Sequence, residues 1–188
     1  MVYISQNLEF NENKIIYTDA VIGVEWEVMM DWEDTLMSAS AAYICEGGGD
    51  ILEIGFGMAI SATYIQSHTI NSHTIIENHP DIIPKAQTWA SGKSNVTIIT
   101  GSWYDVKDSL LTYDGIFYDT FGDQNMKNFS SSLSALTKSN TKVTWWNNNT
   151  DETNFYSIPN VTYQAVIIDP PTNSYFNSTT YYLPKKQF

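Results

Sequence analysis

Short apolar runs alternate with amphipathic segments along the middle of the chain. The runs are bounded by Gly, Asn, Asp and Ser, which is typical of buried strands, and apolar residues recur at helical spacing between them. The pattern predicts strands at Asp50–Ile54, His73–Glu77, Asn95–Thr100, Tyr113–Asp119 and Thr141–Trp146. It predicts helices at Met58–Ser67, Pro80–Ala90 and Gln124–Lys138, with at most a helical turn at Asp105–Leu110. This alternation indicates a mostly parallel α/β sheet with helices on both faces.

The two ends of the chain depart from this alternation. Residues 1–24 are expected to form a polar N-terminal arm, and Glu25–Cys45 is predicted to be an amphipathic helix ended by three glycines. Near the C-terminus, Val161–Ile168 and Tyr175–Leu183 predict an antiparallel hairpin, joined by the turn-forming residues 169–173. The expected product is a single domain over residues 1–188.

A glycine-containing turn follows the first predicted strand, in the run Leu52–Ile60. Gly55 and Gly57 allow the backbone to turn sharply and to approach a ligand, and the next helix offers unpaired N–H groups and a partial positive charge. Glu77 closes the following apolar run, where a carboxylate can accept hydrogen bonds from both hydroxyls of a ribose. The combination predicts a nucleoside-binding crossover.

The loop differs at one position from a dinucleotide-binding loop. The pattern G-x-G-x-x-G would place glycine where this chain has Ile60. The missing glycine favours S-adenosylmethionine, whose methionine carboxylate needs no pyrophosphate site. A dinucleotide site and a tight turn without a ligand remain the alternatives from this motif alone.

Glu33 interrupts the apolar face of the helix predicted at Glu25–Cys45. Helical spacing would place it among Met29, Met30, Leu36, Met37, Ala41 and Ile44. A carboxylate buried there is costly without a partner, so a cationic or hydrogen-bonding partner is expected. A cationic ligand, a lysine and a water-exposed edge are the candidates.

Asp119 directly follows the fourth apolar run. In open α/β sheets ligands bind beyond the carboxyl ends of the strands, so this charge is expected near a ligand, with a turn cap as the alternative. Trp103 follows the third strand and could flank an adenine ring. The three histidines, His68, His73 and His79, lack the spacing of a metal site, and no metal is predicted.

The net charge and the composition limit the kinds of ligand and partner expected for this chain. The net charge is −12, with nine basic residues that are all lysine, which disfavours nucleic acid and favours a cationic substrate. No arginine is available to clamp a substrate carboxylate. The single cysteine, Cys45, excludes an intramolecular disulfide. No apolar run approaches the ~20 residues that span a bilayer, so a cytoplasmic location without membrane association is expected.

Four segments of this chain closely resemble guanidinoacetate methyltransferase and its relatives, the fungal arginine δ-N-methyltransferases. They are Val28–Met37, Leu52–Ile60, Ile75–Glu77 and Tyr113–Thr120, in the same order and with the same spacing. From Phe121 onward only the strand-and-hairpin pattern persists. The resemblance implies a Rossmann-like class I methyltransferase sheet, mostly parallel with an antiparallel terminal hairpin, and a helix at residues 25–45 over the active site.

The resemblance implies the following site. S-adenosylmethionine, which leaves as S-adenosylhomocysteine, would contact Met29, Met37, Gly55, Phe56, Gly57, Met58, Ala59, Ile60, Glu77, Asn78, His79, Trp103, Tyr104 and Asp119. Glu33 and Asp119 would grip the guanidino group as catalytic residues, and Asn148 and Asn149 would hold the substrate carboxylate. Tyr104 replaces a residue that is usually acidic and Phe121 a usual tyrosine, which leaves the carboxylate end of the site least defined.

The function expected from these features is S-adenosylmethionine-dependent N-methylation of a small guanidino compound, similar to guanidinoacetate. One alternative is methylation of arginine, free or in a protein, because the paired carboxylates would recognise the shared guanidino group. The other is a catalytically silent protein that binds S-adenosylmethionine. The sequence leaves open whether the chain forms a homodimer.

Overall fold

The central sheet of the computed structural model, which describes residues 3–169 and 175–188, has seven strands in the order β6-β5-β4-β7-β8-β10-β9. Their bounds are β4 (Asp50–Ile54), β5 (Ser72–Glu77), β6 (Val96–Thr100), β7 (Tyr113–Tyr118), β8 (Thr137–Trp145), β9 (Thr162–Ile167) and β10 (Thr180–Gln187). The strands from β6 to β8 are parallel, and β10 runs antiparallel between β8 and β9. The predicted sheet and its terminal hairpin are confirmed.

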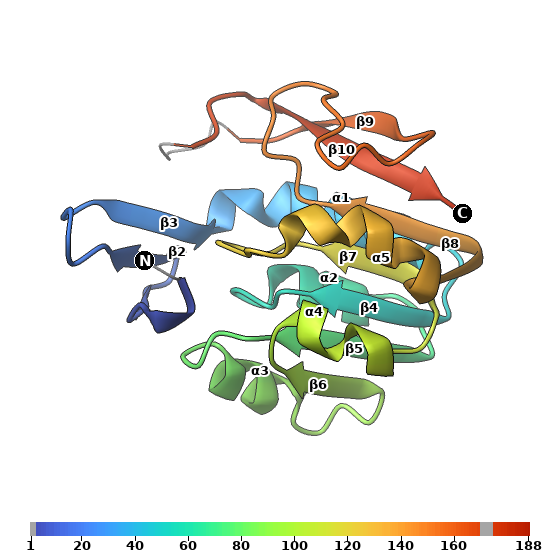
Figure 1. The fold of residues 1–188 in the computed structure, drawn as a ribbon, viewed down its shortest axis with the longest axis horizontal. Helices are drawn as coiled ribbons and strands as arrows, with labels where there is room; N and C mark the ends of the chain where they lie inside the picture. The colour runs from blue at the N-terminus through green and yellow to red at the C-terminus, as the bar shows by residue number, and fades with distance from the viewer. Residues whose placement is uncertain (1–2, 170–174) are drawn as a thin grey trace.

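Helices cover both faces of this sheet (Figure 1). The elements on one face are α1 (Asp34–Cys45), α2 (Ile60–Ser67) and α3 (Ile83–Ala90), and those on the other are α4 (Trp103–Val106) and α5 (Phe129–Leu136). Short 3₁₀ turns lie at η1 (Tyr3–Ser5), η2 (Asp31–Glu33), η3 (Lys107–Ser109) and η4 (Met126–Asn128). Every helix in the described part of the chain is too short or too polar to cross a membrane.

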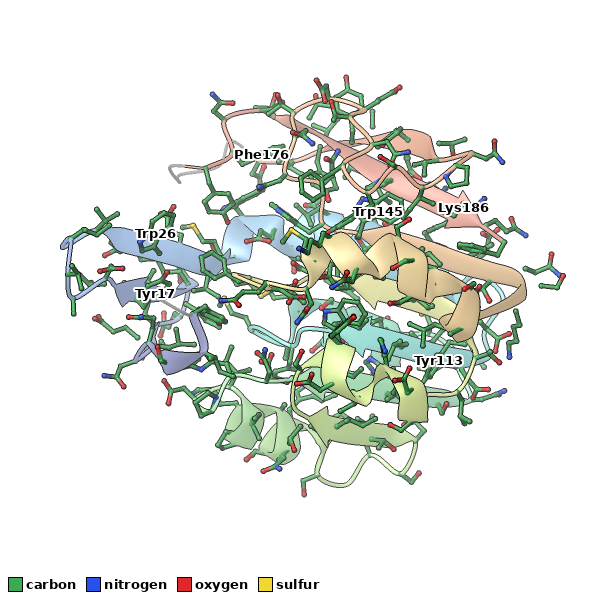
Figure 2. The ribbon with its side chains drawn as sticks, in the orientation of Figure 1. Tyr17, Trp26, Tyr113, Trp145, Phe176 and Lys186 are labelled. Atoms are coloured by element: carbon green, nitrogen blue, oxygen red, sulfur yellow. The ribbon has the colours of Figure 1, made fainter. Side chains whose placement is uncertain are left out.

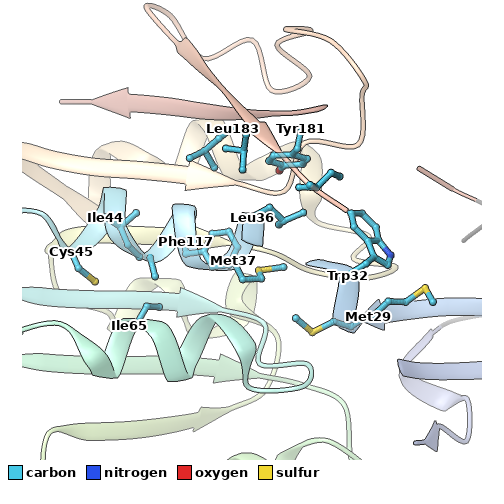
Figure 3. Close-up of a cluster of buried hydrophobic side chains, with 14 of the residues drawn as sticks. Met29, Trp32, Leu36, Met37, Ile44, Cys45, Ile65, Phe117, Tyr181 and Leu183 are labelled. Atoms are coloured by element: carbon cyan, nitrogen blue, oxygen red, sulfur yellow. The ribbon is translucent and has the colours of Figure 1, made fainter. Parts of the chain in front are cut away.

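The side chains of β4 explain this two-sided packing. Because successive residues of a strand point to opposite faces, Ile51 packs with α1 and Leu52 packs with α5. Figure 3 shows the cluster under α1, where Leu36 and Met37 meet Phe117 of β7. Buried strands with apolar residues on both faces are typical of parallel sheets.

A second, three-stranded antiparallel sheet precedes α1. It contains β1 (Glu9–Phe10), β2 (Lys14–Thr18) and β3 (Glu25–Met30). The predicted helix at Glu25–Cys45 is therefore wrong over Glu25–Glu33, and the described part of the predicted N-terminal arm contains two strands. Trp26 and Val28 favour a strand, and β3 satisfies its backbone groups by pairing with β2, so the helix begins only at Asp34.

The bounds of one further helix and one strand differ clearly from the sequence prediction. The helix predicted at Gln124–Lys138 covers only Phe129–Leu136, because Thr137 is extended and starts β8. The last strand runs over Thr180–Gln187 rather than Tyr175–Leu183, since its polar end pairs with β8 and β9. The predicted connection at residues 169–173 lies largely outside the described residues.

The two sheets meet where the parallel strands end. Figure 1 shows β2 and β3 beside the carboxyl ends of β4, β5 and β7, the edge at which ligands bind in open α/β sheets. Val28 and Met29 of β3 line a cavity together with Ile54 of β4 and Asp119 after β7. The N-terminal sheet thus forms a wall of the candidate site.

Candidate active site

Two cavities lie side by side at this edge. The first is a narrow cleft of about 60 Å³ over the glycine turn, and the second has a volume of about 510 Å³ under β3 and the C-terminal loops. Both are lined by Val28, Asp119, Thr120 and Phe121. A group bound in one cavity can therefore reach a group bound in the other beside Asp119.

The glycine turn that forms the floor of the cleft requires glycine at two positions. Gly55 has φ +96°, and a Cβ there would collide with the carbonyl oxygen of Asp119. Gly57 has φ +52°, and a Cβ there would collide with the Met29 sulfur. The backbone therefore passes close to β7 and β3, and leaves room for a ligand at the start of α2.

Glu77 lies in the cleft wall at the end of β5, as the sequence predicted. Its Oε2 accepts a hydrogen bond from the N–H of Phe56 at 3.0 Å, and its Oε1 accepts from the N–H groups of Asn78 and His79, each at 2.8 Å. A carboxylate offers about four acceptor sites. These three bonds fix its orientation and leave capacity for a ligand hydroxyl.

The predicted cofactor contacts fall into two groups. The cleft is lined by Met29, Gly55, Phe56, Gly57, Glu77, Asn78, Trp103 and Asp119. The remaining predicted contacts lie outside that lining: Met37, Met58, Ala59, Ile60, His79 and Tyr104. Met37 is fully buried in the α1 core and His79 is fully buried beside Tyr3. Cofactor contact stays a prediction for both groups.

Asp119 lies on the wall shared by the two cavities. Its backbone N–H donates to the carbonyl of Ile54 at 2.9 Å, which fixes the chain where β7 ends. Burial raises the pKa of its carboxyl above the ordinary value, and the nearby Glu53 carboxylate raises it further. Asp119 lines both cavities, which agrees with its expected position near a ligand.

Glu33 lines the larger cavity from the turn before α1. It is 4% exposed, and its Oε1 accepts hydrogen bonds from the Met30 N–H at 3.0 Å and the Tyr175 hydroxyl at 2.9 Å. The expected partner is thus a hydroxyl and a backbone group rather than a lysine. Burial and then the charge of Asp119 raise the pKa of Glu33, against the lowering effect of these two bonds.

The larger cavity is acidic and aromatic. Its acidic lining residues are Glu25, Glu27, Glu33 and Asp119, and among the described lining residues none is basic. Its aromatic lining residues include Trp26, Trp146, Phe155, Tyr156 and Tyr175. Trp26 lies on β3 near the exposed hairpin (Figure 2). Asn148 and Asn149 line this cavity too, which agrees with their predicted role of holding the substrate carboxylate.

Several lining residues were not predicted from the sequence. Tyr3 of η1 packs against His79, with ring centroids 4.7 Å apart, and against Phe121 at 5.0 Å. Asp123 accepts hydrogen bonds from Trp103 Nε1 and the Tyr118 hydroxyl. Tyr3 and Asp123 line the narrow cleft. Neither belongs to a motif, so only the three-dimensional arrangement reveals them.

Comparison with known proteins places this arrangement in a family. The family model described as guanidinoacetate N-methyltransferase matches residues 9–144, which includes the glycine turn, Glu33, Glu77 and Asp119. The chain belongs to the guanidinoacetate N-methyltransferase family. This membership confirms the resemblance inferred from the sequence, and it supports S-adenosylmethionine as the cofactor.

Curated relatives of this family member are fungal. The chain is 36% identical over 132 residues to protein arginine N-methyltransferase 2 of Yarrowia lipolytica, covering 62% of this chain and 28% of that protein. It is 36% identical over 134 residues to the Saccharomyces cerevisiae protein of that name, covering 65% and 31%. A third, from Kluyveromyces lactis, is 29% identical over 218 residues, covering 99% and 53%. The chain thus spans about half or less of each relative.

Solved structures support the fold assignment for this family member. Spermidine synthase from Thermotoga maritima matches with a TM-score of 0.65 at 11% identity, covering 96% of this chain and 72% of that one. Precorrin-6y C5,15-methyltransferase from Geobacter metallireducens matches with a TM-score of 0.63 at 12% identity, covering 92% and 93%. These similarities concern the fold alone.

Proposed function

We propose that this chain transfers a methyl group from S-adenosylmethionine to a guanidino nitrogen of arginine. The observation that carries the proposal is the position of Asp119, on the wall that separates the glycine-turn cleft from the acidic cavity. A cofactor in the cleft and a guanidinium beside Glu33 would meet at this carboxylate. Cavities of about 300–1,000 Å³ suit small ligands or a side chain, and the acidic one has about 510 Å³.

The acidic lining supports arginine over guanidinoacetate as the acceptor. In guanidinoacetate a carboxylate lies close to the guanidino group and would enter a cavity lined by four acidic residues. In an arginine residue of a polypeptide, the backbone is several methylenes away and carries no carboxylate. The relatives named protein arginine N-methyltransferase 2 support the same choice.

Guanidinoacetate remains the second candidate, because of two specific observations. The matching family model carries its name. Asn148 and Asn149 line the acidic cavity and offer neutral donors to a carboxylate. A catalytically silent binding protein is not favoured, since both carboxylates expected to hold the guanidino group line the same cavity.

The glycine turn and Glu77 fit S-adenosylmethionine, which supplies an electrophilic methyl group on a sulfonium. Glu33 would fix the guanidino plane and Asp119 would orient the reacting nitrogen toward the cleft. The pKa of guanidinium lies far above that of an ordinary carboxylate, so its full deprotonation by a carboxylate before attack would be strongly uphill. Asp119 is therefore proposed to accept the proton during or after C–N bond formation, helped by its raised pKa.

A methyl-transfer assay with labelled cofactor tests the acceptor. Arginine, an arginine-containing peptide, guanidinoacetate and a citrulline-containing peptide would be compared at equal concentration. We expect the arginine peptide to have the highest kcat/KM and the neutral citrulline peptide to give no product. Faster transfer to guanidinoacetate would select the second candidate, and methylation of citrulline would contradict recognition by paired carboxylates.

A further inference from the structure

A buried polar cluster lies behind the glycine-turn cleft. Glu53 of β4 and His73 of β5 are each 0% exposed, and their Oε2 and Nε2 atoms are 3.0 Å apart. The hydroxyl of Ser61 in α2 donates a hydrogen bond to Oε1 of Glu53. The mechanism proposed above does not use any of these three side chains.

A contact between Gln66 and His73 indicates which nitrogen of the His73 ring carries the proton. Gln66 Nε2 lies 3.3 Å from Nδ1 of His73 and, as an amide donor, gives Nδ1 the role of acceptor. In this tautomer the ring proton is on Nε2, on the side of Glu53. The Ser61 hydroxyl donates to Oε1 of Glu53, whereas Oε2 of Glu53 and Nε2 of His73 lie close together without the geometry of a hydrogen bond. No lysine pairs with Glu53 among the described residues.

This arrangement is not what packing alone would select. A carboxylate in the centre of a sheet is strongly disfavoured unless its charge is compensated, and an apolar side chain of similar size is often at least as stable there. Glu53 also lies close enough to Asp119 for its charge to raise the pKa of that carboxyl. Glu53 and Asp119 thus place two carboxylates beside the cleft, and no lysine pairs with either of them among the described residues.

Ser61 lies between Glu53 and the cleft. It is 3% exposed and lines the cleft together with Gly55 and Gly57. Because its single proton points to Glu53, its oxygen presents only lone pairs to the cleft. Hydrogen bonding to a carboxylate strengthens a hydroxyl as an acceptor, so a cation is favoured at this point.

An anion is favoured within one helical turn of the same point. Ser61 is the second residue of α2, whose first N–H groups have no partner inside the helix and carry a partial positive charge. An acceptor backed by a carboxylate beside a helix N-terminus matches the two charges of an amino acid zwitterion. The methionine part of S-adenosylmethionine has such an ammonium and carboxylate.

We propose that Ser61 binds the α-ammonium group of the cofactor, and that Glu53 and His73 act as positioning residues that hold its hydroxyl as an acceptor. The inference rests on cofactor binding at the glycine turn and does not depend on the identity of the methyl acceptor. It assigns a ligand-binding role to a serine that lies outside the glycine pattern.

The test measures binding rather than turnover. Isothermal titration calorimetry would compare S-adenosylhomocysteine with its des-amino analogue, 5′-deoxy-5′-(3-carboxypropylthio)adenosine, which keeps the carboxylate. We expect the unsubstituted chain to bind the analogue at least tenfold more weakly. Ser61→Ala should weaken S-adenosylhomocysteine about tenfold and change the affinity for the analogue less than twofold.

Three further variants separate this role from a structural one. Ser67→Ala removes an exposed hydroxyl that donates to Tyr64 at the other end of α2, and should change neither affinity. Ser61→Thr keeps the hydroxyl and should retain part of the preference for the amino group. Glu53→Gln, provided that its melting temperature shows a folded chain, should reduce that preference as Ser61→Ala does.

Three results would overturn the proposal. Equal weakening of both ligands by Ser61→Ala would show that the serine only supports the fold of the cleft, and unchanged affinities would show that it does not contact the ligand. If the unsubstituted chain bound neither ligand, the cofactor site itself would be wrong and this inference with it. Normal binding of S-adenosylhomocysteine with no methyl transfer to any guanidino compound would contradict only the proposed function.

Discussion

Two carboxylates that line the acidic cavity, those of the buried Glu33 and the half-buried Asp119, are central to the proposed chemistry at the scale of single residues. Glu33 has hydrogen-bond donors on one oxygen, and Asp119 faces both cavities. Without a cation between them each charge disfavours the other, which adds to the effect of burial on the pKa of Glu33. A bound guanidinium would compensate both charges at once.

Substitution of Asp119 separates a catalytic role from a structural one. Asp119→Asn keeps the shape but removes the charge and the proton acceptor, so the single-turnover rate should fall at least ~100-fold. The affinity for S-adenosylhomocysteine should change much less. Asp108→Asn, at an exposed position in η3, is the matched control. A rate within threefold of the unsubstituted chain, together with a lower melting temperature, would instead indicate a structural carboxylate.

The raised pKa values predict how pH acts on folding. Below the pKa of the unfolded carboxyls, ~4, both states are protonated and the contribution to stability is complete. As pH rises through the higher folded pKa values of Glu33 and Asp119, this stability is lost. Calorimetric melting of the ligand-free chain should show a decline toward neutral pH, and the double variant Glu33→Gln/Asp119→Asn should show a flatter profile. An unchanged profile would contradict the shifts.

At the scale of elements, β3 is a strand that the sequence pattern did not predict. The parallel strands, the glycine turn and the acids at strand ends could be predicted because local patterns specify them. Residues 25–30 could not, because alternating Glu and apolar residues suit a strand only when a partner such as β2 exists. Of the alternatives left open for Glu33, a water-exposed edge is wrong, because the residue is buried; it lies in a 3₁₀ turn rather than on a helical face.

Because residues 25–30 form β3 and not a helix, Trp26 lines the acidic cavity, and a role for it in binding can be tested. Trp26 is 43% exposed and offers an aromatic face beside acidic residues, where a guanidinium can stack. Trp26→Ala should lower kcat/KM for an arginine peptide about threefold or more, since exposed cation–π contacts contribute ~0.5–1 kcal/mol. Ile22→Ser, at the exposed hairpin turn, is the control. Equal losses in both variants would indicate a general effect on the hairpin.

At the scale of the whole molecule, charge connects the site to its surroundings. The net charge of −12 and the acidic cavity have the same sign, so the long-range field attracts the cationic group that the cavity would hold. Twelve excess negative charges also disfavour an anionic small molecule at a distance. Negative charge thus predominates both among the residues that line the acidic cavity and in the composition of the whole chain.

Salt should therefore weaken the binding of a cationic arginine peptide more than the binding of S-adenosylhomocysteine. The Debye length falls from about 30 Å at 0.01 M to about 8 Å at 0.15 M ionic strength. Over this range we expect KM for a lysine-free arginine peptide to rise about threefold or more, because long-range attraction is screened. The affinity for zwitterionic S-adenosylhomocysteine should change less than twofold. A similar salt dependence for both would show that the field does not guide the acceptor.

The shared wall at Asp119 also offers a route to inhibition. A single molecule that joins an adenosyl group to a guanidine through a short spacer could occupy both cavities together. Joining the two fragments makes the second binding event intramolecular, which commonly raises affinity by about 10²–10⁴ over either fragment when the spacer matches the span. The spacer length that gives the tightest inhibitor would then measure, in solution, how far the donor and acceptor stand apart across this carboxylate.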